Sequence, residues 1–348
     1  MTNAVRILTT SATGLIDSLQ AKYQRVLVVT SQRNHGKGGI QTWSEGLYRQ
    51  ASKAGRHATI WGVRDGGLLA ACRGVQGLVR ANYLVFANWK YFAVMLPELM
   101  VRRLFGSKPY VIVLVHGLEL ADLRPRLICM INFAATKLDV EFFANSEFTM
   151  DRARQYGLQG DWEVRRPIAI LPDLDIRANQ KQGREVLSIT RLVERKNLFR
   201  AIDAVVALNH AGANLDYKII GEGPLFSVLA EYAKQHGGGR VHLLGAADEA
   251  TKWCLLKNAD IFLLPSVDCE AGRDFEGYGL ALIEANWVGV PVVAGPSGGM
   301  PEAVQVGRTG YVSDGTVTSI ADCIQKVLSK PLPVAPIRAW AAQHRASN

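Results

Sequence analysis

Short apolar runs recur along this chain, and they limit its fold more than any other feature. Continuous rather than alternating apolarity predicts strands that are buried on both faces, as in parallel sheets. Segments with helical spacing follow two of the runs, at residues 198–211 and 225–235, which completes a β-α-β alternation typical of α/β proteins. The runs occupy residues 26–29, 111–115, 142–144, 186–189, 217–220, 241–244, 261–264 and 291–294.

A break in this alternation divides the chain in two. Residues 165–184 carry two prolines, alternating acidic and basic side chains and a polar run, which is typical of a crossing between domains. A chain of 348 residues is long enough for two domains that each bury a core. We expect an N-terminal domain over residues 1–168 and a C-terminal domain over residues 177–330, with the tail at 333–348 packing back on the first.

The composition excludes several classes of protein. A hydrophobic share of 48% and a charged share of 20% are globular values. No apolar stretch approaches the ~20 residues needed to span a bilayer, and the first 22 residues lack the apolar core of a signal peptide. Five scattered cysteines without a CxxC pair indicate a reducing cytosol, and neither a disulfide framework nor a zinc site.

The positive charge is concentrated in the N-terminal half. Residues 1–168 hold 22 Lys and Arg against 12 Asp and Glu, and the remainder holds 18 against 19. A nucleic-acid partner is one interpretation, but the longest basic runs are pairs and no aromatic-rich RNA-binding signature is present. An anionic membrane surface or acceptor is therefore the better interpretation.

Glu276 and Glu284 bracket the stretch EGYGLALIE. Its glycines punctuate a turn that runs into an apolar, helix-forming segment. Such a turn presents backbone N–H groups and the positive end of a helix to an anion, and the two carboxylates can accept hydrogen bonds from hydroxyls on either side of that anion. An anion with polyols on both sides describes a nucleotide-sugar.

Three loops that follow apolar runs are further candidates for ligand binding. Glycines at 36, 38 and 39 allow the backbone to approach a ligand closely, although an ordinary loop is the alternative. His116 follows the run at 111–115, at the carboxyl end of a strand where open α/β sheets bind ligands, with Glu119 as a neighbour or as plain surface charge. Arg191 and Lys196 follow the run at 186–189 and could grip a diphosphate.

Other motifs are weaker when taken alone. The cations at 191–196 also fit a solvated charge cluster, to which we assign Arg195. The sequence GEGP at 221–224 lacks the third glycine of a dinucleotide fingerprint and favours a tight turn between strand and helix. Asp268, Glu270 and Asp274 crowd the approach to Glu276, where they suit either ligand hydroxyls or a cation.

Taken together, these motifs resemble the retaining glycosyltransferases of family 4, which have the GT-B fold. The likeness runs through most of the chain, and its order and spacing are specific in combination. The strongest element is the E-x7-E pattern of Glu276 and Glu284. The others are Gly38-Gly39-Ile40, Val115-His116-Gly117, Asn145 to Thr149, Arg191 with Lys196, Gly221 to Pro224, and Gly298 to Glu302.

The resemblance implies two Rossmann-like domains that face each other across a cleft, with a role for each motif. Arg191 and Lys196 would neutralise the diphosphate as it departs, and His116 would lie beside the transferred sugar. Glu276 would hold the hexose, and Glu284 the ribose. The remaining donor-binding groups would be Gly38, Gly39 and the backbone amides of Gly277, Tyr278, Gly279 and Leu280.

Catalysis would then be electrostatic help to a departing nucleoside diphosphate, with net retention. Because two cations and a helix end can replace a metal, we expect no metal and no cofactor, the nucleotide-sugar being a co-substrate. The acid-rich lead into Glu276 resembles bacterial mannosyltransferases of surface polysaccharide or glycolipid pathways, which favours GDP-mannose over UDP-sugars. The alternatives are a UDP-sugar-dependent transferase, an epimerase or phosphorylase-like enzyme of this fold, and a non-catalytic nucleotide-sugar binder.

The expected acceptor is a lipid-linked saccharide or glycolipid on the cytoplasmic face of a membrane. Residues 89–105 are apolar and aromatic, with Lys90, Arg102 and Arg103 among them. They form either a core helix of the first domain or an interfacial element that dips into an anionic bilayer, helped by the basic half of the chain. The second alternative predicts a cytoplasmic, peripheral membrane enzyme.

Overall fold

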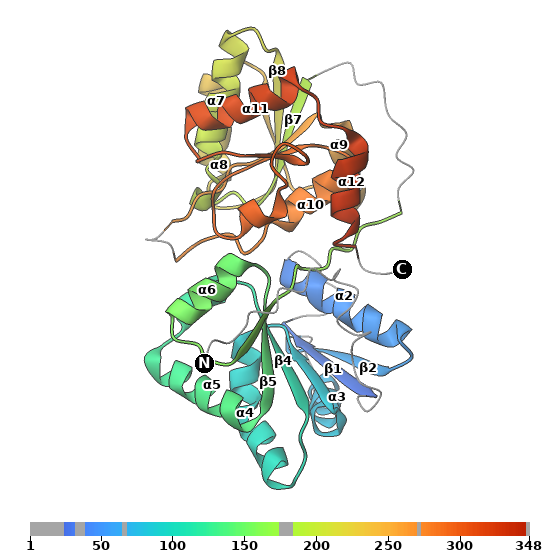
Figure 1. Cartoon of the computed structure of the whole chain (residues 1–348). Coiled ribbons are helices and arrows are strands. Elements are labelled where there is room, and N and C mark those ends of the chain that lie inside the picture. Colours follow the sequence, from blue (N-terminus) through green and yellow to red (C-terminus); the bar gives the residue numbers. More distant parts are fainter. Residues whose placement is uncertain (1–23, 32–38, 65–67, 174–183, 270–272, 346–348) are drawn as a thin grey trace. The chain divides into compact units, whose positions relative to one another are not determined.

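The computed structural model describes residues 24–31, 39–64, 68–173, 184–269 and 273–345. The chain forms two compact units, Met1–Ile170 with His344–Asn348, and Leu171–Gln343. Each is an α/β unit with its own six-stranded sheet (Figure 1), and the paired strands are parallel. The expected α/β class with two parallel sheets is confirmed.

The first sheet has the strand order β2-β1-β3-β4-β5-β6. Its strands are β1 (Arg25–Thr30), β2 (His57–Gly62), β3 (Tyr83–Phe86), β4 (Tyr110–Val115), β5 (Asp139–Ala144) and β6 (Asp161–Val164). Its helices are α2 (Gly39–Lys53), α3 (Leu68–Arg80), α4 (Trp89–Leu104), η1 (Leu118–Asp122), α5 (Pro125–Lys137) and α6 (Glu147–Gln155).

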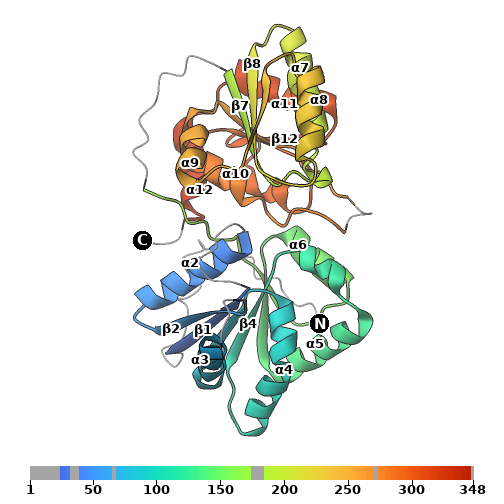
Figure 2. The same cartoon turned by 180° about the vertical axis from the view of Figure 1, so that it is seen from behind.

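Helices cover both faces of this sheet, as continuous apolar strands require. The connection from β1 to β2 crosses the sheet in the opposite direction to the later ones, so right-handed crossovers place α2 on one face and α3 to α6 on the other. Val28 packs in one core with Trp43 of α2, whereas a Cβ added at Gly77 of α3 would lie 3.2 Å from Leu27. Figure 2 shows α4 and α5 together on the second face.

The second sheet has the order β12-β11-β10-β7-β8-β9. One hydrophobic core joins α7, α8 and α11 to it. Its strands are β7 (Arg184–Ile189), β8 (Leu215–Ile220), β9 (Val241–Gly245), β10 (Ile261–Leu264), β11 (Val292–Ala294) and β12 (Gly310–Val312). Its helices are η2 (Glu194–Lys196), α7 (Leu198–His210), α8 (Phe226–His236), α9 (Glu249–Asn258), α10 (Leu280–Trp287), η4 (Met300–Ala303), α11 (Val317–Ser329) and α12 (Val334–Ala342).

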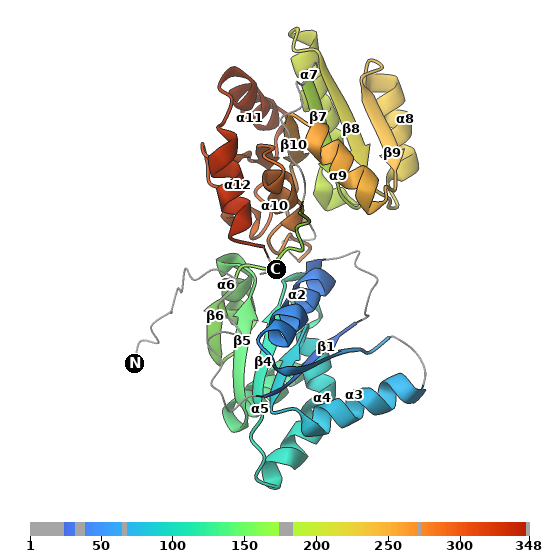
Figure 3. The same ribbon diagram turned by 90° about the vertical axis from the view of Figure 1, so that its right-hand side faces the viewer.

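The C-terminal tail divides between the two units, rather than packing on the first unit over the whole of residues 333–348. Helix α12 lies beside α10 in the second unit (Figure 3), where Trp340 is buried and its Nε1 donates to the carbonyl of Ala303 at 2.8 Å. The chain rejoins the first unit at His344, whose carbonyl accepts from the amide of Ala169 at 2.7 Å. Helix α12 departs from the prediction because its apolar side packs against α10 of the second unit.

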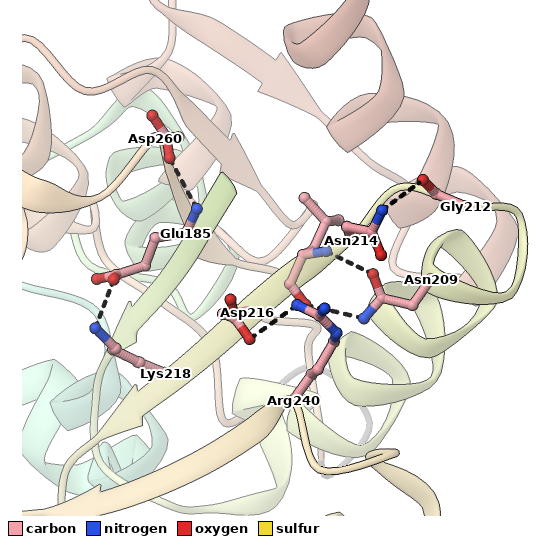
Figure 4. Close-up of polar contacts among 9 residues, drawn as sticks. Glu185, Asn209, Gly212, Asn214, Asp216, Lys218, Arg240 and Asp260 are labelled. Carbon is pink, nitrogen blue, oxygen red and sulfur yellow. Dashed lines mark hydrogen bonds and ion pairs between the residues drawn. The ribbon is translucent and has the colours of Figure 1, made fainter. Parts of the chain in front are cut away.

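Polar contacts stabilise the amino ends of the strands in the second sheet (Figure 4). The amide of Glu185, in β7, donates to Asp260 at 2.8 Å, and its carboxylate pairs with Lys218 at 2.5 Å. Arg240 pairs with Asp216 at 3.2 Å, with both side chains more than 40% exposed. These contacts lie at the amino-terminal edge of the sheet. The candidate site residues lie at the opposite edge, beyond the carboxyl ends of the strands.

Candidate functional site

The second sheet reverses its winding between β7 and β10. From β7 the chain continues to β8 and β9 on one side, and from β10 it continues to β11 and β12 on the other. Open α/β sheets bind ligands beyond the carboxyl ends of the strands at such a switch point. Arg191 and Lys196 follow β7, and Glu276 follows β10, so three predicted site residues belong to this edge.

Hydrogen bonds fix the loop after β7 to the loop after β10. The carbonyl of Arg195 accepts from the amide of Val267 at 2.8 Å, and Nδ2 of Asn197 donates to the carbonyl of Pro265 at 3.1 Å. Asn197 has a φ of 56°, a left-handed conformation that asparagine tolerates better than most residues. This anchored turn buries the two cations before it, leaving Arg195 and Lys196 8% and 6% exposed.

Both buried cations contact one carboxylate. Nζ of Lys196 and Nη1 of Arg195 each form an ion pair with Oε1 of Glu276, and Nε of Arg195 lies 2.9 Å from Oδ1 of Asp274. Burial lowers the pKa of Lys196, and the neighbouring charge of Arg195 adds to this effect. Burial likewise lowers the pKa of Arg195, against the attraction of Asp274. The prediction that Arg195 belongs to a solvated cluster is wrong.

Arg191 differs from these two cations because its side chain is exposed. In the described ranges it forms no ion pair, yet its charge is close enough to lower the pKa of Lys196 further. Two cations and two carboxylates balance each other in the buried cluster. The exposed side chain of Arg191 beside this cluster can therefore reach an anionic ligand.

A glycine turn after β11 holds the backbone of Glu276. The amide of Glu276 donates to Oγ of Ser297 at 3.0 Å, and its carbonyl accepts from the amide of Gly299 at 2.9 Å. Oδ1 of Asp268 accepts from Ser297 at 2.8 Å and from the amide of Gly298 at 3.0 Å. Gly298 has a φ of 50°, and an added Cβ would lie 2.1 Å from the Glu276 carbonyl. Asp268 thus supports Glu276 through this turn.

Helix α10 begins directly after the turn that follows Glu276. Gly279 is its N-cap with a φ of 88°, a conformation that favours glycine. The first amides of a helix lack intrahelical partners and can donate to an anion. Of the four amides expected to bind the donor, that of Leu280 opens α10, and those of Gly277 to Gly279 lie in the turn before it. The side chain of Tyr278 is buried at 3% exposure.

Glu284 lies one turn into α10, and a lysine from another helix holds it. Nζ of Lys252, in α9, lies 3.2 Å from Oε1 of Glu284 and 3.0 Å from Oε2 of Glu249. Burial raises the pKa of Glu284, and the Lys252 charge opposes that rise. The ring of Trp253 lies 4.8 Å from the same ammonium group. Sequence reasoning missed Lys252, because no motif marks an isolated lysine on a helix.

His116, in the first unit, follows β4. Its Nε2 lies 2.9 Å from the carbonyl of Ala87, and its ring meets the Trp43 ring edge-on at 5.2 Å. A carbonyl can only accept, so Nε2 carries the proton and Nδ1 is an acceptor. Burial lowers the pKa of His116 to about 4, although the bond to Ala87 opposes this. The imidazole is therefore neutral near pH 7 and can accept a hydrogen bond from a hydroxyl.

Two buried polar residues fix the backbone at His116. Oε1 of Glu119 accepts from the His116 amide at 2.6 Å, and Nδ2 of Asn145 donates to the His116 carbonyl at 3.1 Å. Burial raises the pKa of Glu119, against the hydrogen bond from His116. Glu119 is 6% exposed, so the alternative of plain surface charge is wrong.

Several predicted site residues have no described geometry. Gly38 lies outside the described residues, as does Glu270, while Gly39 opens α2. Among the residues that the structure does describe, no three His, Cys, Asp or Glu side chains gather as a metal site would need. The structure thus brings together Lys196, Arg195 and Glu276 at one sheet edge, and Glu284 lies one turn into α10, the helix that follows Glu276.

Comparisons with known proteins match part of this chain to glycosyltransferases. Residues 173–344 match the family described as glycosyl transferases group 1. A GDP-mannose-dependent alpha-(1-6)-phosphatidylinositol monomannoside mannosyltransferase of Mycobacterium tuberculosis is 37% identical over 147 residues, 41% of this chain and 38% of the relative. The putative colanic acid biosynthesis glycosyltransferase WcaL of Escherichia coli is 36% identical over 132 residues, 37% of this chain and 32% of the relative. The matches thus span well under half the length of these relatives.

Solved structures extend the likeness to both units. HepE of Anabaena, in complex with UDP and glucose, superposes with a TM-score of 0.69 at 16% identity and covers 93% of this chain and 96% of its own. A sucrose-phosphate synthase from Thermosynechococcus elongatus gives a TM-score of 0.64 at 15% identity, with 92% and 93% covered. At these identities the likeness concerns the fold alone, and it confirms the expected GT-B fold.

Proposed function

We propose, from the match of residues 173–344 to the glycosyl transferases group 1 family, that this chain is a retaining hexosyltransferase. It would move a hexose from a nucleoside-diphosphate sugar to a lipid-linked saccharide or glycolipid in bacterial surface polysaccharide synthesis. The observation that carries the proposal is the meeting of Lys196 and Glu276 at the switch point of the second sheet. A cation for the diphosphate and a carboxylate for the hexose are the two groups that donor activation needs.

The proposed roles follow from the chemistry of each group. Arg191 and Lys196 stabilise negative charge on the departing diphosphate, and the first amides of α10 donate to the same anion. Glu276 accepts hydrogen bonds from the hexose, and Glu284 from the ribose. His116 is neutral, and its Nδ1 accepts a hydrogen bond from a hydroxyl of the transferred sugar. Gly38 and Gly39 would lie near the phosphates.

The reaction breaks the bond between the anomeric carbon and the diphosphate oxygen and forms a bond from that carbon to the acceptor oxygen. The acceptor proton leaves with the departing phosphate oxygen or goes to solvent. Attack from the face that the diphosphate leaves retains the anomeric configuration. Because Arg191, Lys196 and the start of α10 supply the positive charge, we propose that no metal and no cofactor is required.

GDP-mannose is the donor that we favour, since relatives of this chain are named as GDP-mannose-dependent mannosyltransferases. A UDP-sugar-dependent transferase is the alternative, and a nucleotide-sugar epimerase of this fold is a second one. The likeness to a UDP complex does not decide between the donors, because at 16% identity it speaks for the fold.

A surface on the first unit supports a membrane-bound acceptor. The outer sides of the neighbouring helices α4 and α5 expose large apolar side chains, and we call this set the α4–α5 surface. The cations Arg103 and Lys137 lie beside it, and Nε of Arg103 donates to the Lys137 carbonyl at 3.2 Å. Its apolar members are Val94, Val101, Leu104, Phe105, Met130 and Phe133, exposed by 43–86%.

We propose that the α4–α5 surface rests on an anionic bilayer at the cytoplasmic face. Helix α4 also has a buried side, formed by Trp89, Phe92, Leu96 and Leu99, so the core and interfacial alternatives for residues 89–105 apply to its two sides. Nε1 of Trp89 donates to the Glu119 carbonyl at 3.1 Å, so a helix lying on the membrane would bring the loop of His116 near a lipid-linked acceptor. In the described part of the chain, no helix is long and apolar enough to cross a bilayer.

Thermal-shift screening against GDP-, UDP-, ADP- and dTDP-sugars tests the proposal. We expect stabilisation by one nucleotide class, in line with the linkage between binding and stability. Incubation of that donor without an acceptor then separates the alternatives, because an epimerase converts the donor alone and a transferase does not. Stabilisation by no nucleotide-sugar would contradict the proposed function.

A further inference from the structure

One carboxylate oxygen in this protein has two cationic partners that are adjacent in sequence. Oε1 of Glu276 contacts both Arg195 and Lys196, and Arg195 is held in turn by Asp274 at 2.9 Å. The side chains of Arg195, Lys196 and Glu276 are 9%, 8% and 14% exposed. Lys196 alone would be enough to neutralise Glu276, and Arg195 already pairs with Asp274, so the additional contact of Arg195 with Glu276 calls for an explanation.

The two cations differ in the freedom of their side chains. The guanidinium of Arg195 is tied to Asp274 as well as to Glu276, and the carbonyl of Arg195 accepts from Val267. Asp274 is itself fixed, because it exchanges backbone hydrogen bonds of 2.9 and 3.2 Å with Cys269. The ammonium group of Lys196 has Glu276 as its one ion-pair partner among the described residues. Lys196 can therefore leave the carboxylate at a lower cost than Arg195.

A diphosphate in the proposed site would attract Lys196, since a doubly charged group competes well against one carboxylate. If Lys196 were the only partner, its departure would leave Glu276 buried without a counter-charge, which strongly favours protonation of the carboxyl group. A protonated Glu276 would lose part of its capacity to accept hydrogen bonds from a hexose. A second cation that stays in place allows Lys196 to bind the diphosphate while Glu276 remains ionised.

We propose that Arg195 is a positioning residue that keeps Glu276 ionised and oriented while Lys196 turns to the donor diphosphate. Asp274 would hold Arg195 in place for this task. The inference rests on the proposed function, from which the roles of Lys196 and Glu276 are taken. The charged groups that act on Arg195, on Lys196 or on the neighbouring thiol of Cys269 are Arg191, Glu194, Arg195, Asp268 and Asp274.

Replacement of Arg195 by leucine and by lysine tests the inference. Titration calorimetry with the nucleoside diphosphate of the preferred donor and steady-state kinetics would both be followed between pH 5 and 9. In Arg195→Leu the acid limb of kcat should move upward by about 1–3 pH units, because an opposite charge has been removed from the carboxylate. The affinity for the nucleoside diphosphate should change less than kcat, and Arg195→Lys should recover most of the acid limb. Asp274→Asn should give a smaller shift in the same direction.

Arg240→Leu is the matched control, since Arg240 forms an Arg–Asp pair with Asp216 at the opposite edge of the same sheet (Figure 4). It should keep the wild-type pH profile. A folded Arg195→Leu protein with the wild-type profile would overturn the inference. A uniform loss of kcat at all pH values that Arg195→Lys does not rescue would also overturn it, because that pattern indicates that Arg195 only stabilises the loop. If the wild-type protein binds no nucleoside diphosphate, the proposed function fails, and the inference with it.

Discussion

Nζ of Lys252 lies 3.2 Å from Oε1 of Glu284, so a cation from α9 holds the second glutamate of the E-x7-E pattern. The first glutamate, Glu276, is held by Arg195 and Lys196 from the loop after β7. The pattern thus consists of two carboxylates on one segment that are neutralised by cations from two other elements. Both carboxylates are partly buried, at 14% and 25% exposure, and a ligand that contacts them must bring hydrogen-bond donors, such as hydroxyl groups.

Removal of the Glu284 carboxylate should weaken nucleotide binding. We expect Glu284→Ala to lower the affinity for the preferred nucleoside diphosphate roughly 10- to 100-fold, because hydrogen bonds to a charged group contribute about 1.5–3 kcal/mol. Titration calorimetry measures the change. Glu231→Ala, on the exposed side of α8, is the control and should bind as the wild type does. Equal affinity in the Glu284 variant would remove this residue from the ribose site.

Much of the fold could be predicted, because strands that are buried on both faces stand out as apolar runs. Seven of the eight predicted runs lie wholly in strands, and the eighth, at residues 291–294, begins one residue before β11. Residues 198–211 and 225–235 agree with α7 and α8. The edge strands β2 and β6 were missed, since half-exposed strands such as His57–Gly62 lack a continuous apolar run. Strand β12 was also missed, because a strand of three residues is too short to stand out as an apolar run. Strand β3 is apolar, buried and central; it met the same criterion, and the prediction nevertheless omitted it.

The site was less predictable, because it depends on contacts between distant segments. The pairing of Lys196 with Glu276 joins residues 80 positions apart, and it requires the reversal between β7 and β10. Glycines could be recognised in the sequence as a turn, but the support that Gly298 gives to Glu276 depends on a backbone contact across the sheet edge. Lys252 carries no sequence signal, and the burial of Arg195 follows from the anchoring of Asn197 rather than from its own neighbours in sequence.

His116 should remain neutral well below the usual range for histidine. Its pKa lies at about 4 in the folded protein against 6.5 for the free side chain, because it is buried. The unfolded chain therefore binds more protons between these values, and the free energy of unfolding should fall by roughly 3–4 kcal/mol as pH drops from about 6.5 to below 4. Histidine-selective NMR would check the inflection and the Nε2–H tautomer. An inflection near 6.5 would contradict the buried arrangement.

Gly298 should not tolerate a side chain. Gly298→Ala places a Cβ 2.1 Å from the Glu276 carbonyl at a φ of 50°, whereas Gly307→Ala meets nothing within 4 Å at a φ of 74°. Both variants bear the left-handed penalty of about 1–2 kcal/mol, and the clash should cost Gly298→Ala about 1–3 kcal/mol more. Urea unfolding measures the difference. Calorimetry should show weaker donor binding in the Gly298 variant alone, and equal losses in both variants would argue against this support of Glu276.

Activity should persist without divalent metal. Arg191, Lys196 and the first amides of α10 supply positive charge to the diphosphate under the proposed mechanism, which leaves a metal no required task. Transfer measured in excess chelator should equal transfer in its absence. Loss of activity that magnesium or manganese restores would contradict this expectation. The carboxylates Asp268 and Asp274 would then be the candidate metal ligands.

The α4–α5 surface should decide whether the protein binds membranes. Leu104 and Phe105 are 82% and 86% exposed at the end of α4, and burial of such side chains in a bilayer interface is favourable whereas their exposure to water is not. We expect flotation with vesicles that contain anionic lipid, weaker flotation with neutral vesicles, and a loss at high salt because screening weakens the contribution of the surrounding cations. Leu104→Ser with Phe105→Ser should reduce flotation strongly. Val228→Ser, which changes a 57% exposed side chain in α8, should leave it unchanged; equal flotation with anionic and neutral vesicles would contradict an electrostatic contribution.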